Sequence, residues 1–167
     1  MIPIHTIVNH NSTSKVEFVI GESKNIPTTA ILTFPIINHS EEGIKYVLIQ
    51  DKNLWWNAVG GHIEEGESSI EALKRESMEE CGVIINNIET LGYFLITRVS
   101  GENKYPKVSQ IPLTISTVQK LEIKGWTLRE TLGRGIFTEE EVINLLKSSR
   151  SDNDQMLEIF KKYVRKN

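Results

Sequence analysis

A pair of glycines followed by a glutamate-rich helix most limits how this chain of 167 residues can fold. Residues 60–67 read Gly-Gly-His-Ile-Glu-Glu-Gly-Glu, and residues 68–81 have the spacing of a helix. Ser68 and Glu71 have the spacing of a capping box at its start, and Gly82 stands where a left-handed residue ends a helix. The sequence therefore predicts a loop, a helix and a second loop in succession.

Three carboxylates share one side of this predicted helix. At about 100° per residue, Glu76, Glu79 and Glu80 lie within an arc of roughly 100°, while the adjoining face can pack on a sheet. Like charges at i and i+4 cost about 0.2–0.5 kcal/mol even on an exposed helix. Mg²⁺ or Mn²⁺ relieves this repulsion, because hard divalent cations bind oxygen and are shared between carboxylates and substrate phosphates. The cluster indicates either a metal site or a solvated acidic face.

The spacing of the whole segment favours the metal site. Residues at fixed separations match the box of one known family: Gly61, Glu67, Arg75, Glu76, Glu79, Glu80, Gly82 and Val83. Residues 61–83 thus resemble the box of the Nudix hydrolase family (MutT-like), and a weaker similarity extends over residues 28–146. The resemblance implies an α/β fold, a Nudix-like α/β/α sandwich with a mixed β-sheet and a loop-helix-loop catalytic motif. It also implies hydrolysis of a diphosphate linkage in a nucleoside diphosphate derivative or a nucleoside triphosphate.

The same resemblance implies a role for each charged residue of the box. Glu76 and Glu80 would be the principal metal ligands, with Glu79 assisting, and Glu76 is also a candidate general base. Arg75 and Glu67 would form a supporting pair that orients the carboxylates. We therefore expect a pyrophosphohydrolase that depends on Mg²⁺ or Mn²⁺.

Three uncharged positions complete the comparison with the family. Gly61 would allow close approach of the backbone, and its carbonyl would be a further metal ligand. Ser77 stands where an aliphatic residue is usual, and its hydroxyl can donate to the carbonyl of Leu73. Val59 stands where proline often precedes the two glycines. Neither departure removes a ligand, so both concern packing and turn rigidity rather than chemistry.

Candidate substrate-binding residues outside the charged positions are weaker. Trp55 and Trp56 should point to opposite faces of a strand, so one should pack in the core. The other, with Trp56 as the candidate, could stack on a base or line a substrate cleft, although simple packing is the favoured alternative. His62 could contact a phosphate or simply fill its loop. Tyr105 lies in a loop that could border the site, and two basic residues have the same ambiguity: Arg98 and Lys107.

An additional acidic ligand or base is expected from a later loop. Glu130 is the first candidate, followed by Glu102 and Glu122. The acidic run 139–141 instead suits the first turn of a helix, where negative charge complements the dipole.

The rest of the chain predicts a mixed sheet covered by helices. Pro35 and Pro112 would mark edge strands or bulges. Extended segments are expected at 16–20, 28–37, 44–50, 54–59, 83–85, 89–99 and 108–123, and further helices at 138–149 and 151–166.

The composition limits the partners of the chain. Its length and its 39% hydrophobic and 25% charged residues fit one domain over residues 1–167. The net charge of −3 provides no basic footprint for duplex nucleic acid, so we expect a small phosphorylated substrate, a nucleotide above all. The longest apolar stretch, 30–37, is too short to cross a membrane, and a cytoplasmic location is the default. The oligomeric state is open, a homodimer being one alternative.

Two other functions are alternatives to the hydrolase. A Nudix-fold isomerase of isoprenoid diphosphates usually needs additional Cys and His ligands, and Cys81 is the single cysteine. The acidic neighbours of Cys81 would also raise the pKa of its thiol, which favours a buried, inert group. A non-catalytic Nudix-fold nucleotide-binding or regulatory module would be indicated by loss of a box carboxylate, and none is lost.

Overall fold

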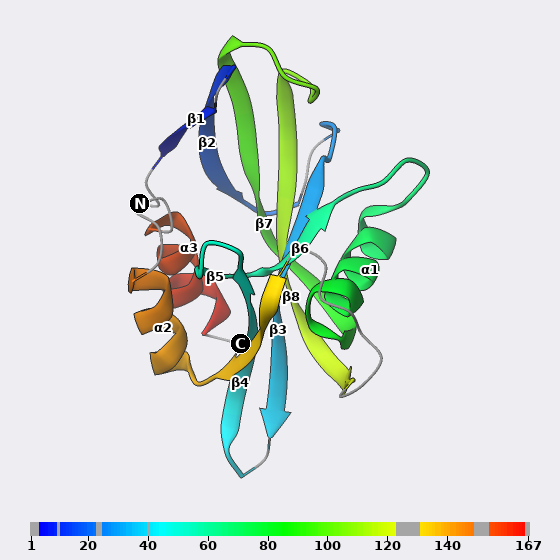
Figure 1. The fold of residues 1–167 in the computed structure, drawn as a ribbon, viewed down its shortest axis with the longest axis vertical. Helices are drawn as coiled ribbons and strands as arrows, with labels where there is room; N and C mark the ends of the chain where they lie inside the picture. Colours follow the sequence, from blue (N-terminus) through cyan, green and yellow to red (C-terminus); the bar gives the residue numbers. More distant parts are fainter. Residues whose placement is uncertain are drawn as a thin grey trace.

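A computed structural model describes residues 4–9, 11–22, 25–39, 41–122, 131–148 and 154–165. Its centre is a mixed β-sheet with helices on both faces (Figure 1). The strands are β1 His5–Asn9, β2 Ser12–Ile20, β3 Ala30–His39, β4 Gly43–Asp51, β5 Trp56–Asn57, β6 Val59–His62, β7 Val83–Gly101, β8 Val108–Leu121 and β9 Thr131–Phe137. The helices are α1 Ser69–Cys81, α2 Glu139–Ser148 and α3 Asp154–Ile159, which continues into the π-helical turn η1 Phe160–Val164.

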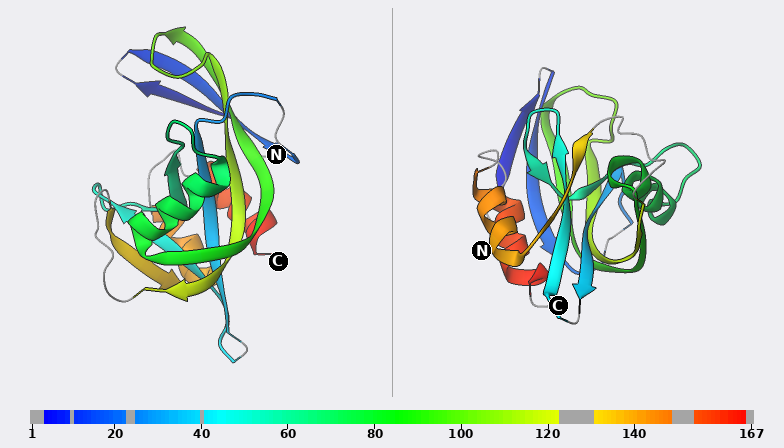
Figure 2. Two further views of the ribbon diagram at one scale, coloured as in Figure 1. Left: turned by 90° about the vertical axis from the view of Figure 1, so that its right-hand side faces the viewer. Right: turned by 60° about the horizontal axis from the view of Figure 1, so that its bottom comes forward.

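The strands follow the order β1-β2-β7-β8-β3-β4-β5, with β6 also paired to β3 and β9 to β4. The pairing of β3 with β8 is parallel, whereas the other strand pairs are antiparallel. Helix α1 covers one face of the sheet, and α2, α3 and η1 cover the other, a separation that is also visible in both views of Figure 2. The expected α/β sandwich with a mixed sheet is confirmed.

Strand β4 shows why the molecule has two cores. Successive side chains of a strand point to opposite faces. Leu48 accordingly packs in the core that contains Phe160 of η1, whereas Val47 and Ile49 pack in the core that contains Leu73 of α1. Each of these side chains is at most 5% exposed, so both helical layers are held to the sheet by apolar burial.

The ends of α1 follow from local sequence. The Ser68 hydroxyl accepts the Glu71 N–H at 3.3 Å, and the Glu71 carboxylate accepts the Ser68 N–H at 2.9 Å, which completes the predicted capping box. Gly82 ends the helix with φ 61° and ψ 40°, as predicted. The Ser77 hydroxyl donates to the Leu73 carbonyl at 2.7 Å, so the unusual serine is satisfied within the helix.

Several elements differ from the sequence prediction. Strands β1 and β9 were not predicted, and the segments expected at 83–85 and 89–99 join into one strand, β7, through Asn87 with a positive φ of 44°. The last helix of the described chain changes from α to π hydrogen bonding at Phe160. None of the described helices has the length and apolar character needed to span a lipid bilayer.

The two prolines have different settings. Pro35 lies within β3, inside the sheet, so the expectation of an edge strand is wrong. The ladder between β3 and β6 ends two residues before Pro35, and the ladder with β4 begins one residue after it. Proline is tolerated there because the pairing on that side is interrupted. Pro112 in β8 lies beside a register shift in β7, between Thr90 and Gly92, which agrees with the expected bulge.

Replacing Gly60 by Ala should lower the free energy of unfolding by about 2 kcal/mol. Gly60 has a φ of 141°, and an added Cβ would lie 2.1 Å from the carbonyl oxygen of Ile31 in the neighbouring strand β3. Urea denaturation measures the loss. Gly66→Ala is the matched control, because Gly66 also has a positive φ, 82°, but has open space around the added carbon. Equal losses in the two variants would show that the contact with β3 is unimportant.

Candidate active site

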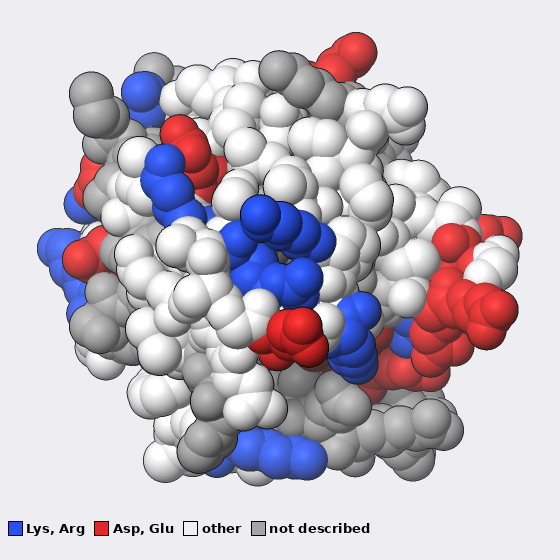
Figure 3. Space-filling model, turned by 90° about the horizontal axis from the view of Figure 1, so that it is seen from above, with Lys and Arg blue, Asp and Glu red and all other residues white. Residues whose placement is uncertain are grey.

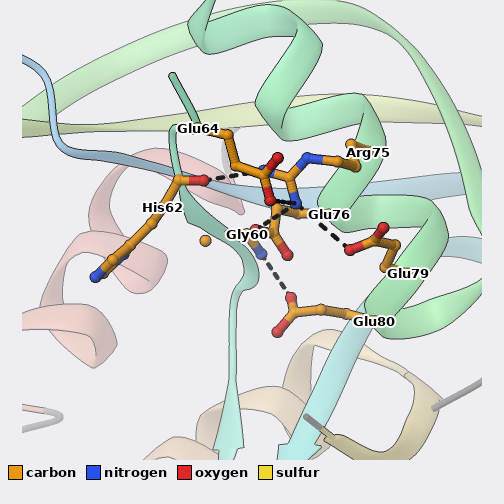
Figure 4. Close-up of a pocket in the computed structure, with 8 residues that line it drawn as sticks. Gly60, His62, Glu64, Arg75, Glu76, Glu79 and Glu80 are labelled. Atoms are coloured by element: carbon orange, nitrogen blue, oxygen red, sulfur yellow. Dashed lines mark hydrogen bonds and ion pairs between the residues drawn. The ribbon is translucent and has the colours of Figure 1, made fainter. Parts of the chain in front are cut away.

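A cavity of about 500 Å³ opens between β6 and α1 (Figure 4). The pairing of β6 with β3, with Gly61 opposite Ile31, holds the glycine pair beside the helix. Residues from both elements and the connecting loop line the cavity: Gly60, Gly61, His62, Glu64, Arg75, Glu76, Glu79 and Glu80. The carboxylates predicted to share one side of the helix therefore share one cavity.

Gly61 and Glu76 are in close contact because the glycine has no side chain. A Cβ at position 61 would lie 2.3 Å from Oε1 of Glu76 and 2.5 Å from its carboxyl carbon. The Glu76 side chain is only 15% exposed. Glycine at this position thus creates the space that the Glu76 carboxylate occupies.

Glu80, one turn further along α1, contacts the other glycine. The Gly60 N–H donates to Oε2 of Glu80 at 2.8 Å (Figure 4). Residues i and i+4 of a helix project from the same face. Glu76 and Glu80 are therefore presented together to the backbone of the glycine pair.

Arg75 links the loop before α1 to the carboxylates of the helix. Its guanidinium binds Glu67 in bidentate fashion, with Nε–Oε1 at 2.9 Å and Nη2–Oε2 at 3.0 Å. Nη1 also donates to Oε1 of Glu76 at 2.9 Å and to Oε2 of Glu79 at 3.4 Å. Nη2 donates to the His62 carbonyl at 3.0 Å. This single side chain fixes the relative positions of the loop and two of the carboxylates.

The Arg75–Glu67 pair stays charged over a wide pH range. Hydrogen bonding from Arg75 is the main cause that holds the pKa of Glu67 below its ordinary value. The same hydrogen bond with Glu67 is the main cause that raises the pKa of Arg75. Because Arg75 carries one positive charge among several carboxylates, the cavity retains an excess of negative charge that a divalent cation could balance.

The donor set fits a hard cation. Carboxylate oxygens of Glu76, Glu79 and Glu80 line one cavity with the backbone of Gly61, and Mg²⁺ prefers such oxygen ligands. Among the described residues, no three His, Cys, Asp or Glu side chains already converge as a metal-binding group. Instead, Arg75 holds Glu76 and Glu79, while Glu80 accepts from the glycine backbone.

His62 and Tyr105 meet at the rim of the cavity. Figure 4 shows the His62 ring directed away from the carboxylates, and this ring lies 5.3 Å from the Tyr105 ring, edge to face. Arg98 fixes the loop that carries Tyr105, because its Nη1 donates to the Asn103 side chain at 2.8 Å and to the Tyr105 carbonyl at 3.1 Å. The structure thus connects the β7–β8 loop with the glycine-containing strand.

Trp56 is not among the residues that line the cavity, and its role in substrate binding stays a prediction. The Trp56 ring packs edge to face against Phe137 of β9, with 4.8 Å between the ring centroids. Gly135 leaves room for this pair, because a Cβ there would lie 2.2 Å from the Phe137 ring. Trp56 therefore packs on the core beneath α2, the alternative weighed from the sequence.

The additional acidic ligand or base expected from a later loop is not assigned to any of its three candidates. Glu130 lies outside the described residues. The Glu122 carboxylate pairs with Lys120, and Glu102 lies exposed at the start of the β7–β8 loop. Neither Glu102 nor Glu122 is among the residues that line the cavity.

Cys81 is a buried thiol, as the sequence indicated. Its side chain is fully buried, and Sγ lies 3.1 Å from the Ser77 carbonyl. Burial, followed by the nearby charge of Glu80, raises the pKa of Cys81 to about 12. A thiol in this state is a poor nucleophile and a poor metal ligand.

Sequence reasoning missed two residues of β9 that contact the end of α1. The Thr131 hydroxyl donates to the Glu80 carbonyl at 2.9 Å. Nη1 of Arg134 donates to the carbonyls of Cys81 and Gly82. One signal was available, because the last turn of α1 contains no basic residue to complement the helix dipole. That signal could not show which distant residue supplies the charge.

Comparison with known proteins places this site in a family. The family model for the NUDIX domain matches residues 27–157, and the chain therefore belongs to the Nudix family. Membership confirms the expected fold and the expected class of hydrolase. A comparison with curated protein sequences gave no match.

Solved structures share the fold. A mutant of the Bacillus subtilis pyrophosphohydrolase BsRppH superposes with a TM-score of 0.69 at 20% identity, covering 92% of this chain and 91% of that protein. A NUDIX hydrolase from Nitrosomonas europaea gives 0.61 at 19% identity, covering 84% and 90%. The mutator MutT protein from Bacillus halodurans gives 0.51 at 26% identity, covering 77% and 80%. The fold is thus shared over most of each protein.

Proposed function

We propose that this Nudix protein uses Mg²⁺ or Mn²⁺ to hydrolyse a diphosphate linkage in a nucleoside diphosphate derivative or a nucleoside triphosphate. The observation that carries the proposal is the placement of Glu76 and Glu80 against the two glycines of one cavity. Similarity to the pyrophosphohydrolase from Bacillus subtilis supports the reaction class but not a particular substrate.

The residues of the box have distinct tasks in this reaction. Glu76 and Glu80, assisted by Glu79 and the Gly61 carbonyl, would hold the divalent cation. When bound, the cation supplies charge neutralisation at the phosphates and activates water for attack on phosphorus. Glu76 is the proposed acceptor of the water proton. Arg75 keeps Glu76 oriented by donating a hydrogen bond to its carboxylate. Arg75 is itself held by the two hydrogen bonds that it donates to Glu67 in the loop before the helix.

The rim formed by His62 and Tyr105 is the proposed site for the substrate group beyond the diphosphate. The Lys104 ammonium lies 5.1 Å from the centre of the Tyr105 ring, so an aromatic surface and a positive charge occur together. Figure 3 shows basic side chains in the middle of the face seen from above and acidic ones at its side. A small anionic molecule suits this arrangement better than duplex nucleic acid, which requires a broader basic surface.

Replacing Glu67 by Gln should lower kcat/KM by about 10–100-fold, because Arg75 would lose its charged anchor. The same change should flatten the pH dependence of folding stability at acid pH. A depressed pKa means that the charged Glu67 stabilises the fold above its ordinary pKa of roughly 4.3, and that this stabilisation is lost as pH falls through the lower, folded pKa. Steady-state kinetics measure the loss of kcat/KM. Urea denaturation between about pH 3 and about pH 7 measures the pH dependence of folding stability.

Glu17→Gln provides the matched control, since Glu17 forms an exposed pair with Lys15 on β2. We expect this control to change neither quantity appreciably. A Glu67→Gln protein with parental kcat/KM would show that the ion pair does not support the carboxylates.

A substrate panel tests the proposed function. The parent protein would be incubated with nucleoside triphosphates, nucleotide sugars and dinucleoside polyphosphates, in Mg²⁺ and in EDTA, and the products separated by ion exchange. We expect two phosphorylated fragments, or a monophosphate and pyrophosphate, from at least one class. Absence of turnover together with saturable nucleotide binding would favour a non-catalytic module instead.

A further inference from the structure

The last turn of α1 has an unfavourable charge distribution. It contains Glu79 and Glu80 and no basic residue. The C-terminal end of a helix carries partial negative charge from its unpaired carbonyls, so acidic side chains there are destabilising. The proposed metal ligands therefore occupy a helix end that needs a cation and hydrogen-bond donors from elsewhere.

Strand β9 provides both. The Arg134 guanidinium donates through Nη1 to the carbonyls of Cys81 and Gly82, and through Nη2 to the carbonyl of Glu122 at 3.0 Å. Thr131, in the same strand, donates to the Glu80 carbonyl at 2.9 Å. These bonds join the end of α1 to two other segments, β9 and the residue that follows β8.

The strand itself is fixed to the sheet beneath the helix. Arg134 is the register partner of Ile49 in β4, and Ile49 is 5% exposed within the core that also contains Cys81 and Leu73 of α1. Arg134 therefore connects the end of the helix to a strand that contributes to the core beneath it. A planar guanidinium can serve several carbonyls at once, which a lysine ammonium does with less directional control.

We propose that Arg134 is a positioning residue for the metal-binding carboxylates, a role that rests on the proposed function. Its bonds fix the backbone of the last turn, from which the Glu79 and Glu80 side chains project. The bond between Glu80 and the Gly60 N–H depends on the position of that turn. Arg134 is not among the residues that line the cavity, and it acts through the carbonyls of Cys81 and Gly82.

Mn²⁺ binding, measured by calorimetry in the absence of substrate, tests this role. Arg134→Ala should weaken Mn²⁺ affinity by about 10–100-fold, as is typical when a residue that orients metal ligands is removed. Arg134→Lys should recover part of that loss, and Thr131→Val, which removes one hydrogen bond, should have a smaller effect. Arg165→Ala is the matched control, because Arg165 pairs with Glu139 on the opposite helical layer.

Binding stoichiometry separates positioning from misfolding. A partly unfolded variant would bind fewer ions per chain with parental affinity, whereas loss of positioning weakens affinity at full stoichiometry. If Arg134→Ala does not fold, Thr131→Val and Arg134→Lys decide the question in the same way. Parental Mn²⁺ affinity in the folded variants would overturn the positioning role while leaving turnover by the parent intact. A parent protein without Mn²⁺ binding or turnover would overturn the proposed function itself, and the positioning role with it.

Discussion

Replacing Glu76 by Gln should reduce kcat for diphosphate hydrolysis by about 10²–10⁴-fold, the range expected for loss of a general base. Glutamine preserves the size of the side chain but removes the charge that would bind a cation and accept a proton. The Glu76 carboxylate lies against Gly61 and accepts a hydrogen bond from Arg75 at 2.9 Å. No other carboxylate of α1 occupies that position, so none can replace it.

The measurement is steady-state turnover of the best panel substrate at saturating Mg²⁺. Glu65→Gln is the matched control, because Glu65 is exposed in the loop before α1 and does not line the cavity. Circular dichroism would verify that both variants fold. Parental Mg²⁺-dependent turnover by Glu76→Gln would exclude Glu76 from the chemistry.

Gly61→Ala should lower kcat/KM by about 10²-fold, the cost expected when a reacting group is displaced by about 1 Å. The added Cβ would lie 2.3 Å from Oε1 of Glu76. Gly61 is not among the glycines with a positive φ, so alanine can adopt its backbone conformation. Because the obstructing group is the end of a flexible side chain, the carboxylate should move while the fold persists.

This expectation separates the two glycines. Gly61→Ala should affect activity strongly and the free energy of unfolding weakly, whereas Gly60→Ala should destabilise the fold by its contact with the β3 backbone. Thermal melts and kinetics of both variants test the contrast. A folded Gly61→Ala protein with parental kcat/KM would show that the space beside Glu76 is not required.

The box and the ends of α1 were predictable because they depend on local spacing. Ser68, Glu71 and Gly82 act within one or two turns of the helix, and the side shared by Glu76 and Glu80 follows from helical periodicity. The contacts of Arg75 were partly predictable, since the family resemblance implied a pair with Glu67. Its bond to Glu79 joins residues i and i+4 of one helix and so also follows from periodicity, whereas its bond to the His62 carbonyl required the folded loop.

Features that depend on distant pairing were not predictable. Strand β9 contains Gly133 and Gly135, and glycine is depleted in strands. Only the fold shows that Gly135 makes room for Phe137 and Trp56, whose rings pack edge to face. Likewise, the bond from Thr131 to Glu80 joins residues 51 positions apart, a separation for which single-sequence periodicity gives no signal.

The dependence of turnover on Mg²⁺ tests most directly whether the α1 carboxylates act by holding a divalent cation. Initial rates of the parent on the best panel substrate would be measured in EDTA and over a Mg²⁺ titration. We predict no turnover in EDTA and a saturable rise with Mg²⁺, which Glu76→Gln should largely abolish. Equal rates in EDTA and in Mg²⁺ would contradict metal-assisted hydrolysis at this site.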